Sequence, residues 1–273
     1  MHVGNYITKQ CKAILESKQQ AIIYAVVFSI LPFASWLSVA LVTLVTLRKG
    51  AKPGFDVLLP ALVIHSVPLM MLVPLSSALI NTLIAYLPCY FAALILRKTE
   101  SWQVVFGVFL IQAFFGCLIV QLIVPGFIVD QFGQIKAVLT QYHELVETSL
   151  NGINSLILAQ LFFGIQILSV FVSALISLLF ARSMQAKLFL PDGLRNELTA
   201  FRSGKVSFLI LVGLCLAFYY EIPLAINIFP MMLSYFLISG FGLVYFIFSS
   251  KRKVKVFILL MLLILLKPTL ILF

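Results

Sequence analysis

The chain has 273 residues, of which 62% are hydrophobic and 10% charged, whereas a typical soluble domain is about 45–50% apolar and about 25% charged. Nine acidic and nineteen basic residues cannot cover a soluble protein of this size, so the composition excludes a soluble fold and requires the lipid bilayer as a second solvent. The net charge of +10 does not indicate nucleic-acid binding, because the basic residues lie in short clusters between apolar runs, as in the cytoplasmic loops of membrane proteins.

The N-terminal part of the chain predicts a polar segment followed by a broken apolar run. Residues 1–20 are polar and are expected to stay on the protein as an interfacial segment. The run 21–47 is long for one span and short for two, and Pro32 disfavours helix in its middle. If its basic flanks at Lys18 and Arg48 are both cytoplasmic, the run is a tight hairpin of two short helices, which we favour. If it is one kinked span, the N-terminus lies outside.

The rest of the chain alternates apolar runs with charged clusters. Because the runs are apolar on both faces, they predict α-helices, which satisfy their own backbone hydrogen bonds in lipid. The expected runs are 55–75, 77–96, 102–124, 153–180 with a helical continuation to 188, 206–219, 223–248 and a last run to 273. Placing the basic clusters on the cytoplasmic side predicts an all-α, polytopic integral membrane bundle with about eight transmembrane helices, within a range of seven to nine.

Two polar segments interrupt this single transmembrane domain, which covers residues 21–273. The segment 125–152 has a formal charge of −2 and apolar residues at helical spacing, which predicts an amphipathic non-cytoplasmic segment. The segment 182–205 has five basic and two acidic residues and is expected to be a cytoplasmic loop.

No pattern in the chain predicts catalysis. We find no metalloprotease, P-loop or nucleophile-elbow motif, and no ionisable residue deep within a span. The four cysteines form no C-x-x-C pair, and only His2, His65 and His143 could assist a metal. We therefore expect no catalytic residues, no metal site, no cofactor and no enzyme activity.

Polar residues within the runs are mostly amides, and these are open to two interpretations. They could form hydrogen bonds between helices, or they could line a cavity for a neutral or weakly polar small molecule. Gln112 and Gln166 lie on the two runs that flank the segment 125–152. The ligand-cavity candidates are Gln112, Gln160, Gln166, Asn81 and His65.

Two other regions are candidates for docking a partner. Ala21 and Ala25 are small residues four apart, a spacing that lets helices approach closely. The stretch 194–205 resembles a short amphipathic helix, which either anchors the loop to lipid headgroups or binds a partner subunit. Its docking candidates are Arg195, Glu197, Arg202 and Lys205.

Two stretches resemble a known family, the YybS-like bacterial membrane proteins. They are residues 36–50, WLSVALVTLVTLRKG, and residues 194–205, LRNELTAFRSGK. The family is a domain of unknown function, distantly similar to the substrate-binding S subunits of energy-coupling-factor transporters. Those subunits bind vitamins or metals and dock on a coupling subunit through small residues of their first helix. The resemblance thus implies docking at Ala21 and Ala25, although this chain has more expected spans than those subunits.

Our leading functional hypothesis is a transport-related, solute-binding protein of the bacterial inner membrane that works with partner subunits. It predicts an outward-open cavity near the runs 102–124 and 153–180 and the segment 125–152. The alternative is a non-transporting membrane scaffold that recruits a partner through its basic cytoplasmic loop.

Overall fold

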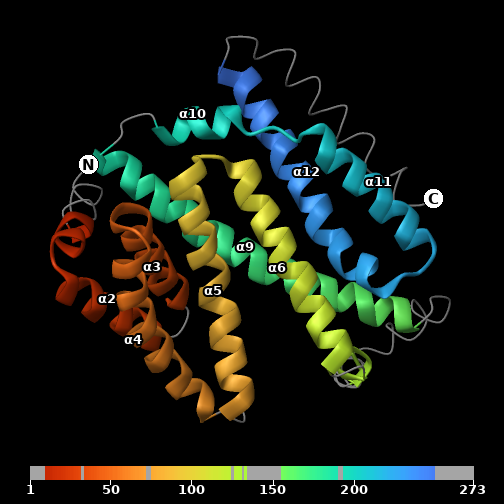
Figure 1. Ribbon diagram of the computed structural model, residues 1–273, viewed down its shortest axis with the longest axis horizontal. Coiled ribbons are helices and arrows are strands. Elements are labelled where there is room, and N and C mark those ends of the chain that lie inside the picture. Colours follow the sequence, from red (N-terminus) through yellow and green to blue (C-terminus); the bar gives the residue numbers. More distant parts are fainter. Residues whose placement is uncertain are drawn as a thin grey trace.

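A computed structural model of the chain describes residues 10–31, 34–71, 75–123, 126–130, 132–133, 155–189 and 193–249. Within these ranges all regular structure is helical (Figure 1). The helices are α2 (Lys18–Ile30), α3 (Ser35–Lys49), α4 (Ala51–Met70), α5 (Leu75–Thr99), α6 (Trp102–Ile123), α9 (Ser155–Phe189), α10 (Gly193–Ala200), α11 (Lys205–Tyr219) and α12 (Pro223–Ser249). The all-α prediction is therefore confirmed for the part of the chain that the structure covers.

In the described part of the chain, five helices are long and apolar enough to cross a membrane, namely α4, α5, α6, α9 and α12. The other apolar helices are shorter: α2 has 13 residues, and α3 and α11 have 15 each. At about 1.5 Å per residue these are roughly 20–22 Å long, less than the hydrocarbon core of about 30 Å. The basic cluster 251–255, the expected last run that follows it, and most of the segment 125–152 lie outside the described residues.

The first apolar run forms two helices that pack on one another. Leu31, which ends α2, has the extended backbone angles φ −68° and ψ 124°, so the helix stops where the sequence predicted a break. The Ser38 hydroxyl of α3 donates a hydrogen bond of 2.7 Å to the Ala25 carbonyl of α2. An ion pair of 2.7 Å joins Lys18, at the start of α2, to Asp56, at the start of α4. The run is therefore a hairpin, and both of its ends lie at the same end of the molecule.

Basic residues of separate helices gather at this end, which we call the basic end. The Arg48 guanidinium lies 3.9 Å from the ring centre of Phe189, which brings the end of α3 to the end of α9. Arg97, at the end of α5, donates a hydrogen bond of 3.3 Å to the Thr46 carbonyl of α3. Lysines accompany these arginines at Lys49 and Lys98. Clusters that are distant in sequence thus share one end, as the predicted topology requires.

Helix α3 lies at the centre of the packing, and all ten of its residues from Ser38 to Leu47 are buried. It contacts α2, α4, α5 and α9. Gly54 lets α4 approach α3 closely, because a Cβ at this position would lie only 2.1 Å from the Thr46 hydroxyl oxygen. The polar groups at both ends of α3 are bonded to α9, where Ser177 donates to the Trp36 carbonyl and Gln185 to the Leu47 carbonyl.

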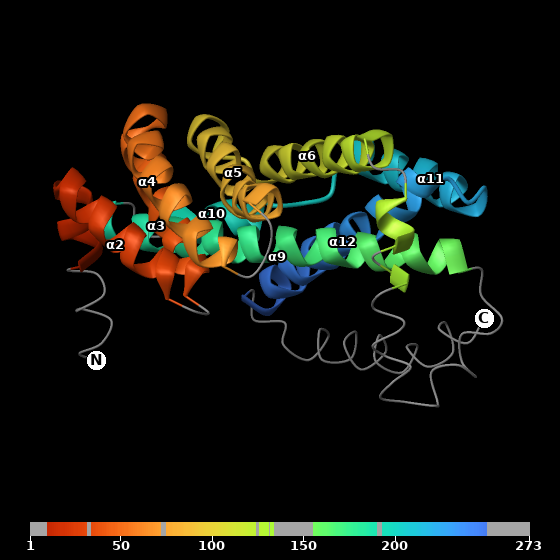
Figure 2. The same ribbon diagram turned by 90° about the horizontal axis from the view of Figure 1, so that it is seen from below.

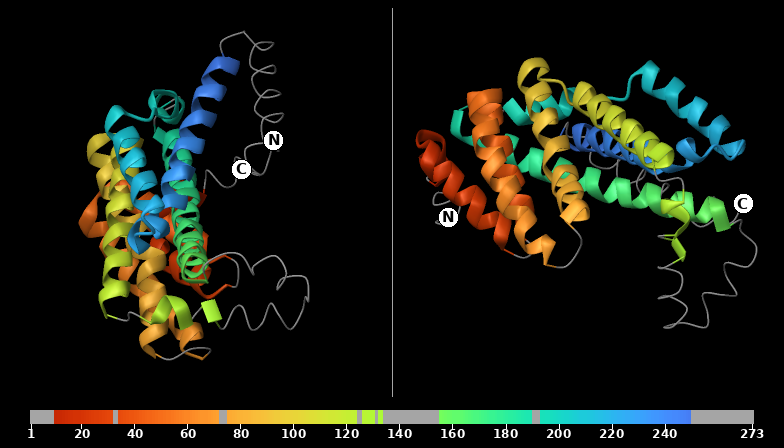
Figure 3. Two further views of the ribbon diagram at one scale, coloured as in Figure 1. Left: turned by 90° about the vertical axis from the view of Figure 1, so that its right-hand side faces the viewer. Right: turned by 60° about the horizontal axis from the view of Figure 1, so that its bottom comes forward.

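Helix α9, with 35 residues, is the element that joins the two halves of the molecule. It packs on α3 and α5 near the hairpin and on α12 on the other side of the molecule. Figure 2 shows it running along the length of the molecule, Figure 1 shows it crossing behind α5 and α6, and the right view of Figure 3 shows it passing behind α5. Pro223 begins α12, a position that tolerates proline because the first N–H groups of a helix have no intrahelical acceptor.

Candidate ligand cavity

A half-open cavity of about 370 Å³ lies between α5, α6 and α9, and it is also lined by Phe127 and by Met231 of α12. Three amide side chains line it, Asn81 from α5, Gln112 from α6 and Gln166 from α9, so we call it the amide cavity. Its other lining residues are apolar or small, and none is charged. The volume falls within the range of about 300–1,000 Å³ that is typical of small-molecule sites.

The structure brings together three of the five residues that the sequence proposed for a cavity. Gln112 is the most informative, because its Oε1 atom is buried and has no hydrogen-bond partner among the described residues. A buried polar atom without a partner costs roughly 1–3 kcal/mol, so such an atom calls for an explanation. A ligand N–H or O–H group placed in the cavity would supply the missing donor.

Two backbone features, which the sequence interpretation missed, widen this cavity. Pro88 lies inside α5 and lacks an N–H, which leaves the Ile84 carbonyl one turn earlier without its usual donor. Both residues line the amide cavity. On the facing helix α6, a Cβ added at Gly116 would meet nothing within 4 Å, so this glycine borders open space. In the sequence, the features that could have indicated this cavity are a proline and a glycine within apolar runs.

Gln160 lies outside the amide cavity, at the crossing of α9 with α12. It is 7% exposed, and its Oε1 atom has no partner in the described part of the chain. One turn later, Gly164 touches α12 so closely that a Cβ there would lie 2.6 Å from the Asn227 carbonyl oxygen. The Asn227 side chain is fully buried, and neither of its polar atoms has a partner within the described ranges.

His65 makes a structural contact within the hairpin half and does not line the amide cavity. Its Nδ1 atom lies 3.0 Å from the Ser29 carbonyl oxygen, and because that oxygen only accepts, Nδ1–H is the donor. Its ring packs at 5.5 Å on the ring of Tyr86. Of the two interpretations given for the polar residues, His65 therefore fits the hydrogen bond between helices and not the lining of a cavity.

A second cavity, of about 190 Å³, lies between α3, α5 and α9. Four serines line it: Ser35 at the start of α3, and Ser169, Ser173 and Ser177 along α9. The three serines of α9 are four residues apart and so share one helix face. That spacing was visible in the sequence, although no site was predicted from it.

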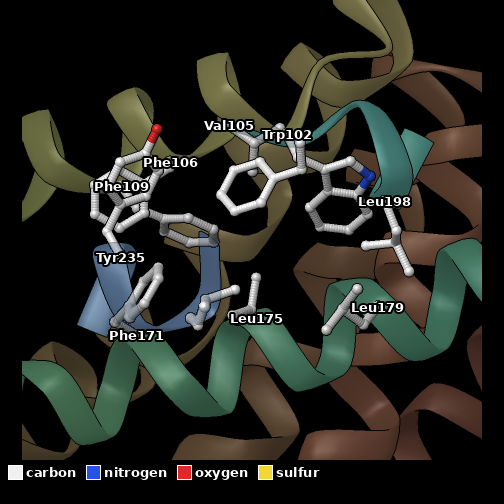
Figure 4. A pocket seen from close by; sticks show the side chains of 11 residues that line it. Trp102, Val105, Phe106, Phe109, Phe171, Leu175, Leu179, Leu198 and Tyr235 are labelled. Atoms are coloured by element: carbon white, nitrogen blue, oxygen red, sulfur yellow. The ribbon is translucent and has the colours of Figure 1, made fainter. Parts of the chain in front are cut away.

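A third, smaller cavity of about 60 Å³ lies nearer the basic end, and we call it the inner chamber. Figure 4 shows Phe171, Leu175 and Leu179 of α9 along one wall and Trp102 beside Leu198 of α10. The chamber also borders Phe106, Phe109 and Tyr235, whose rings form one aromatic cluster with Phe171.

A buried ion pair lies beside the inner chamber, next to Trp102. Arg182 of α9 pairs with Glu197 of α10, and their side chains are only 7% and 11% exposed. The Trp102 indole N–H donates a hydrogen bond of 3.2 Å to Glu197, and Arg182 donates one of 2.6 Å to Gln185. The sequence interpretation placed no buried charge in this region, because only tertiary structure brings Arg182 against Glu197.

Three of the predicted docking residues make their contacts within the chain. Ala21 and Ala25 are buried at 2% and 0% exposure, so the close approach that they permit is made within the chain, where α2 packs on α3 and α4. Glu197 points inward, in the ion pair described above, which corrects the expectation that it faces a partner.

The remaining docking candidates lie at the basic end. Lys205 is exposed at the start of α11, and the Arg202 carbonyl accepts a hydrogen bond from the Gln103 amide. The side chain of Arg195 lies outside the described part of the structure. Arg202 and Lys205 are thus both exposed where docking was expected.

The chain was compared with family models, with curated proteins and with solved structures, and none of them matches it.

Proposed function

We propose that this chain is a membrane-embedded binding protein for a small, weakly polar molecule, and that it acts as the solute-binding component of a transport system in a bacterial inner membrane. The proposal is supported above all by the buried Gln112 Oε1 atom, which has no partner among the described residues and faces a cavity of about 370 Å³. The proposal requires the five long apolar helices to span the bilayer. Partner subunits would supply the energy.

The lining of the amide cavity limits the chemistry of the ligand. Among the described residues no charged side chain lines it, and an isolated ion in such a site would be strongly destabilised. The amide groups of Asn81 and Gln166 can both donate and accept hydrogen bonds, and Gln112 requires a donor. A neutral molecule with at least one N–H or O–H group meets these conditions.

The test is native mass spectrometry of the protein purified in detergent. We expect a bound small molecule in the wild type, and its loss in Gln112→Leu, which removes the acceptor while keeping a similar volume. Gln121→Leu is the matched control, since Gln121 is on the same helix and has a buried amide nitrogen but does not line the cavity. A wild-type protein without a bound molecule, or equal occupancy in all three proteins, would contradict the proposal.

The alternative is a scaffold that recruits a partner through the basic end, and the exposure of Lys98 and Lys205 favours it. Charge reversal at these two lysines tests it. A co-purifying protein that is lost from Lys98→Glu and Lys205→Glu, without any bound small molecule in the wild type, would establish the scaffold and exclude the binding protein.

A further inference from the structure

The amide cavity and the inner chamber are neighbours that share a wall. Phe109 of α6 and Phe171 of α9 line both of them. The two rings meet edge to face, with centroids 5.2 Å apart and an interplanar angle of 80°. Both side chains are buried, at 3% and 4% exposure. The side chains of Phe109 and Phe171 thus mark the boundary between the two cavities.

The inner chamber is apolar, because the polar groups at its edge are engaged elsewhere. The Trp102 N–H donates to Glu197, and the Tyr235 hydroxyl oxygen accepts from Ser207 at 3.4 Å. A cavity without free polar groups does not hold ordered water, which needs two to four polar partners. The inner chamber is therefore suited to a hydrocarbon group.

One face of α6 connects the two compartments. Trp102, Val105, Phe109 and Gln112 follow one another at intervals of three or four residues, so their side chains lie along one stripe of the helix. The stripe begins at the buried indole of the inner chamber and ends at the unpartnered amide oxygen. Ten residues of helix separate these ends, about 15 Å, which is roughly the length of a chain of twelve carbons.

We propose that the ligand is amphipathic: an uncharged hydrogen-bonding head group binds at Gln112 in the amide cavity, and a linear hydrocarbon tail passes between Phe109 and Phe171 into the inner chamber beneath α10. This inference rests on the proposed function and specifies the substrate class. The head donates a hydrogen bond to Gln112 Oε1, and the tail contacts the Trp102 indole. Side-chain rotation of the two phenylalanines opens the passage.

Trp102 is a natural reporter for the tail, because the chain has two tryptophans and Trp36 can be replaced by phenylalanine. Trp102 is buried at 6% exposure, which shields it from quenchers dissolved in the bilayer. The probes are straight-chain primary amides with a terminal bromine, of about four to sixteen carbons. They are added to Trp36→Phe protein in phosphatidylcholine nanodiscs, and Trp102 fluorescence is measured.

We expect quenching to rise with chain length, to level off near twelve carbons, and to be reversed by the unbrominated amide. Gln112→Leu in the same background should show only the weak quenching caused by probe in the bilayer. Leu175→Phe fills the inner chamber and should abolish Trp102 quenching while a four-carbon amide still binds, as read by native mass spectrometry. Leu179→Phe serves the same purpose if the first variant does not fold.

Two outcomes would overturn the inference. If the short amide binds and Trp102 is quenched no more than in Gln112→Leu at any chain length, the tail site is wrong and the proposed function stands. If no amide binds, the amphipathic ligand is excluded, and the proposed function is then decided separately by whether the wild type carries a molecule that Gln112→Leu has lost.

Discussion

The hairpin half of the molecule, built from α2, α3 and α4, and the cavity half, built from α6, α9 and α12, differ in whether their buried polar side chains have hydrogen-bond partners, apart from the ion pair of Arg182 at the basic end. In the hairpin half these groups are bonded: Ser38 to the Ala25 carbonyl, Tyr86 to Ser38, and His65 to the Ser29 carbonyl. In the cavity half, buried atoms of several amides have no partner among the described residues. They belong to Gln112, Gln121, Gln160 and Asn227.

The contrast separates structural polar residues from candidate binding residues, although the two kinds are similar in sequence. A bonded hydroxyl or imidazole holds two helices in register. An unpartnered amide destabilises the protein by roughly 1–3 kcal/mol. Of the four amides, only Gln112 lines the amide cavity, where a ligand could supply the missing donor. The state of the hydrogen bonds, rather than the polarity of the residue, is what distinguishes the two halves.

The largest expected effect is at the basic end of the cavity half, where the polar groups are bonded. Arg182→Met leaves the Glu197 carboxylate buried without its partner, and we expect it to lower the free energy of unfolding by about 3–5 kcal/mol. The double variant Arg182→Met/Glu197→Met should recover most of this loss, because it leaves no uncompensated charge. Thermal unfolding in detergent measures both. If the single and double variants are equally unstable, the ion pair is not what holds α10.

A smaller effect tests the difference in packing between the halves. Gly54→Ala places a Cβ 2.1 Å from the Thr46 hydroxyl oxygen and 3.1 Å from its Cα, so α4 must move away from α3. We expect a loss of about 1–3 kcal/mol, as is usual for overpacking. Gly116→Ala is the control, since its Cβ would meet no atom within 4 Å. Equal losses in the two variants would show that the halves are packed alike.

The smallest effects should have opposite signs. Tyr86→Phe removes the hydrogen bond of 2.9 Å to Ser38 and should lower stability by about 0.5–1.5 kcal/mol. Gln112→Leu removes an unpartnered atom and should leave the stability of ligand-free protein unchanged or raise it by up to about 1 kcal/mol. Chemical denaturation in detergent, after any bound molecule has been stripped, measures both changes. A clear loss in Gln112→Leu would mean that its oxygen has a partner.

Local pattern was enough to predict most helix boundaries. The run 102–124 corresponds to Trp102–Ile123, and the run 223–248 to Pro223–Ser249. The break near Pro32 and the continuation of α9 to Phe189 were also predicted correctly. These features depend on neighbouring residues and hydrophobic length, which sequence displays directly.

The candidate site could be predicted only in part, because it depends on how helices rotate against one another. Gln160 and Gln166 are six residues apart, which predicts different faces of one helix, and in the structure only Gln166 lines the amide cavity. The ion pair of Arg182 with Glu197 could not be foreseen, since it requires α10 to fold back on α9. The inner chamber likewise depends on side chains from four helices.

The short helix α3 has a consequence for biosynthesis. Its contacts with α9 come from residues far ahead in the chain: Ser177 bonds the Trp36 carbonyl and Gln185 bonds the Leu47 carbonyl. A nascent chain that has not yet reached these residues therefore holds a helix too short to span the bilayer, with carbonyl groups that lack their final donors. The centre of this protein is therefore synthesised early, and its packing is completed only after Ser177 and Gln185 have been added to the chain.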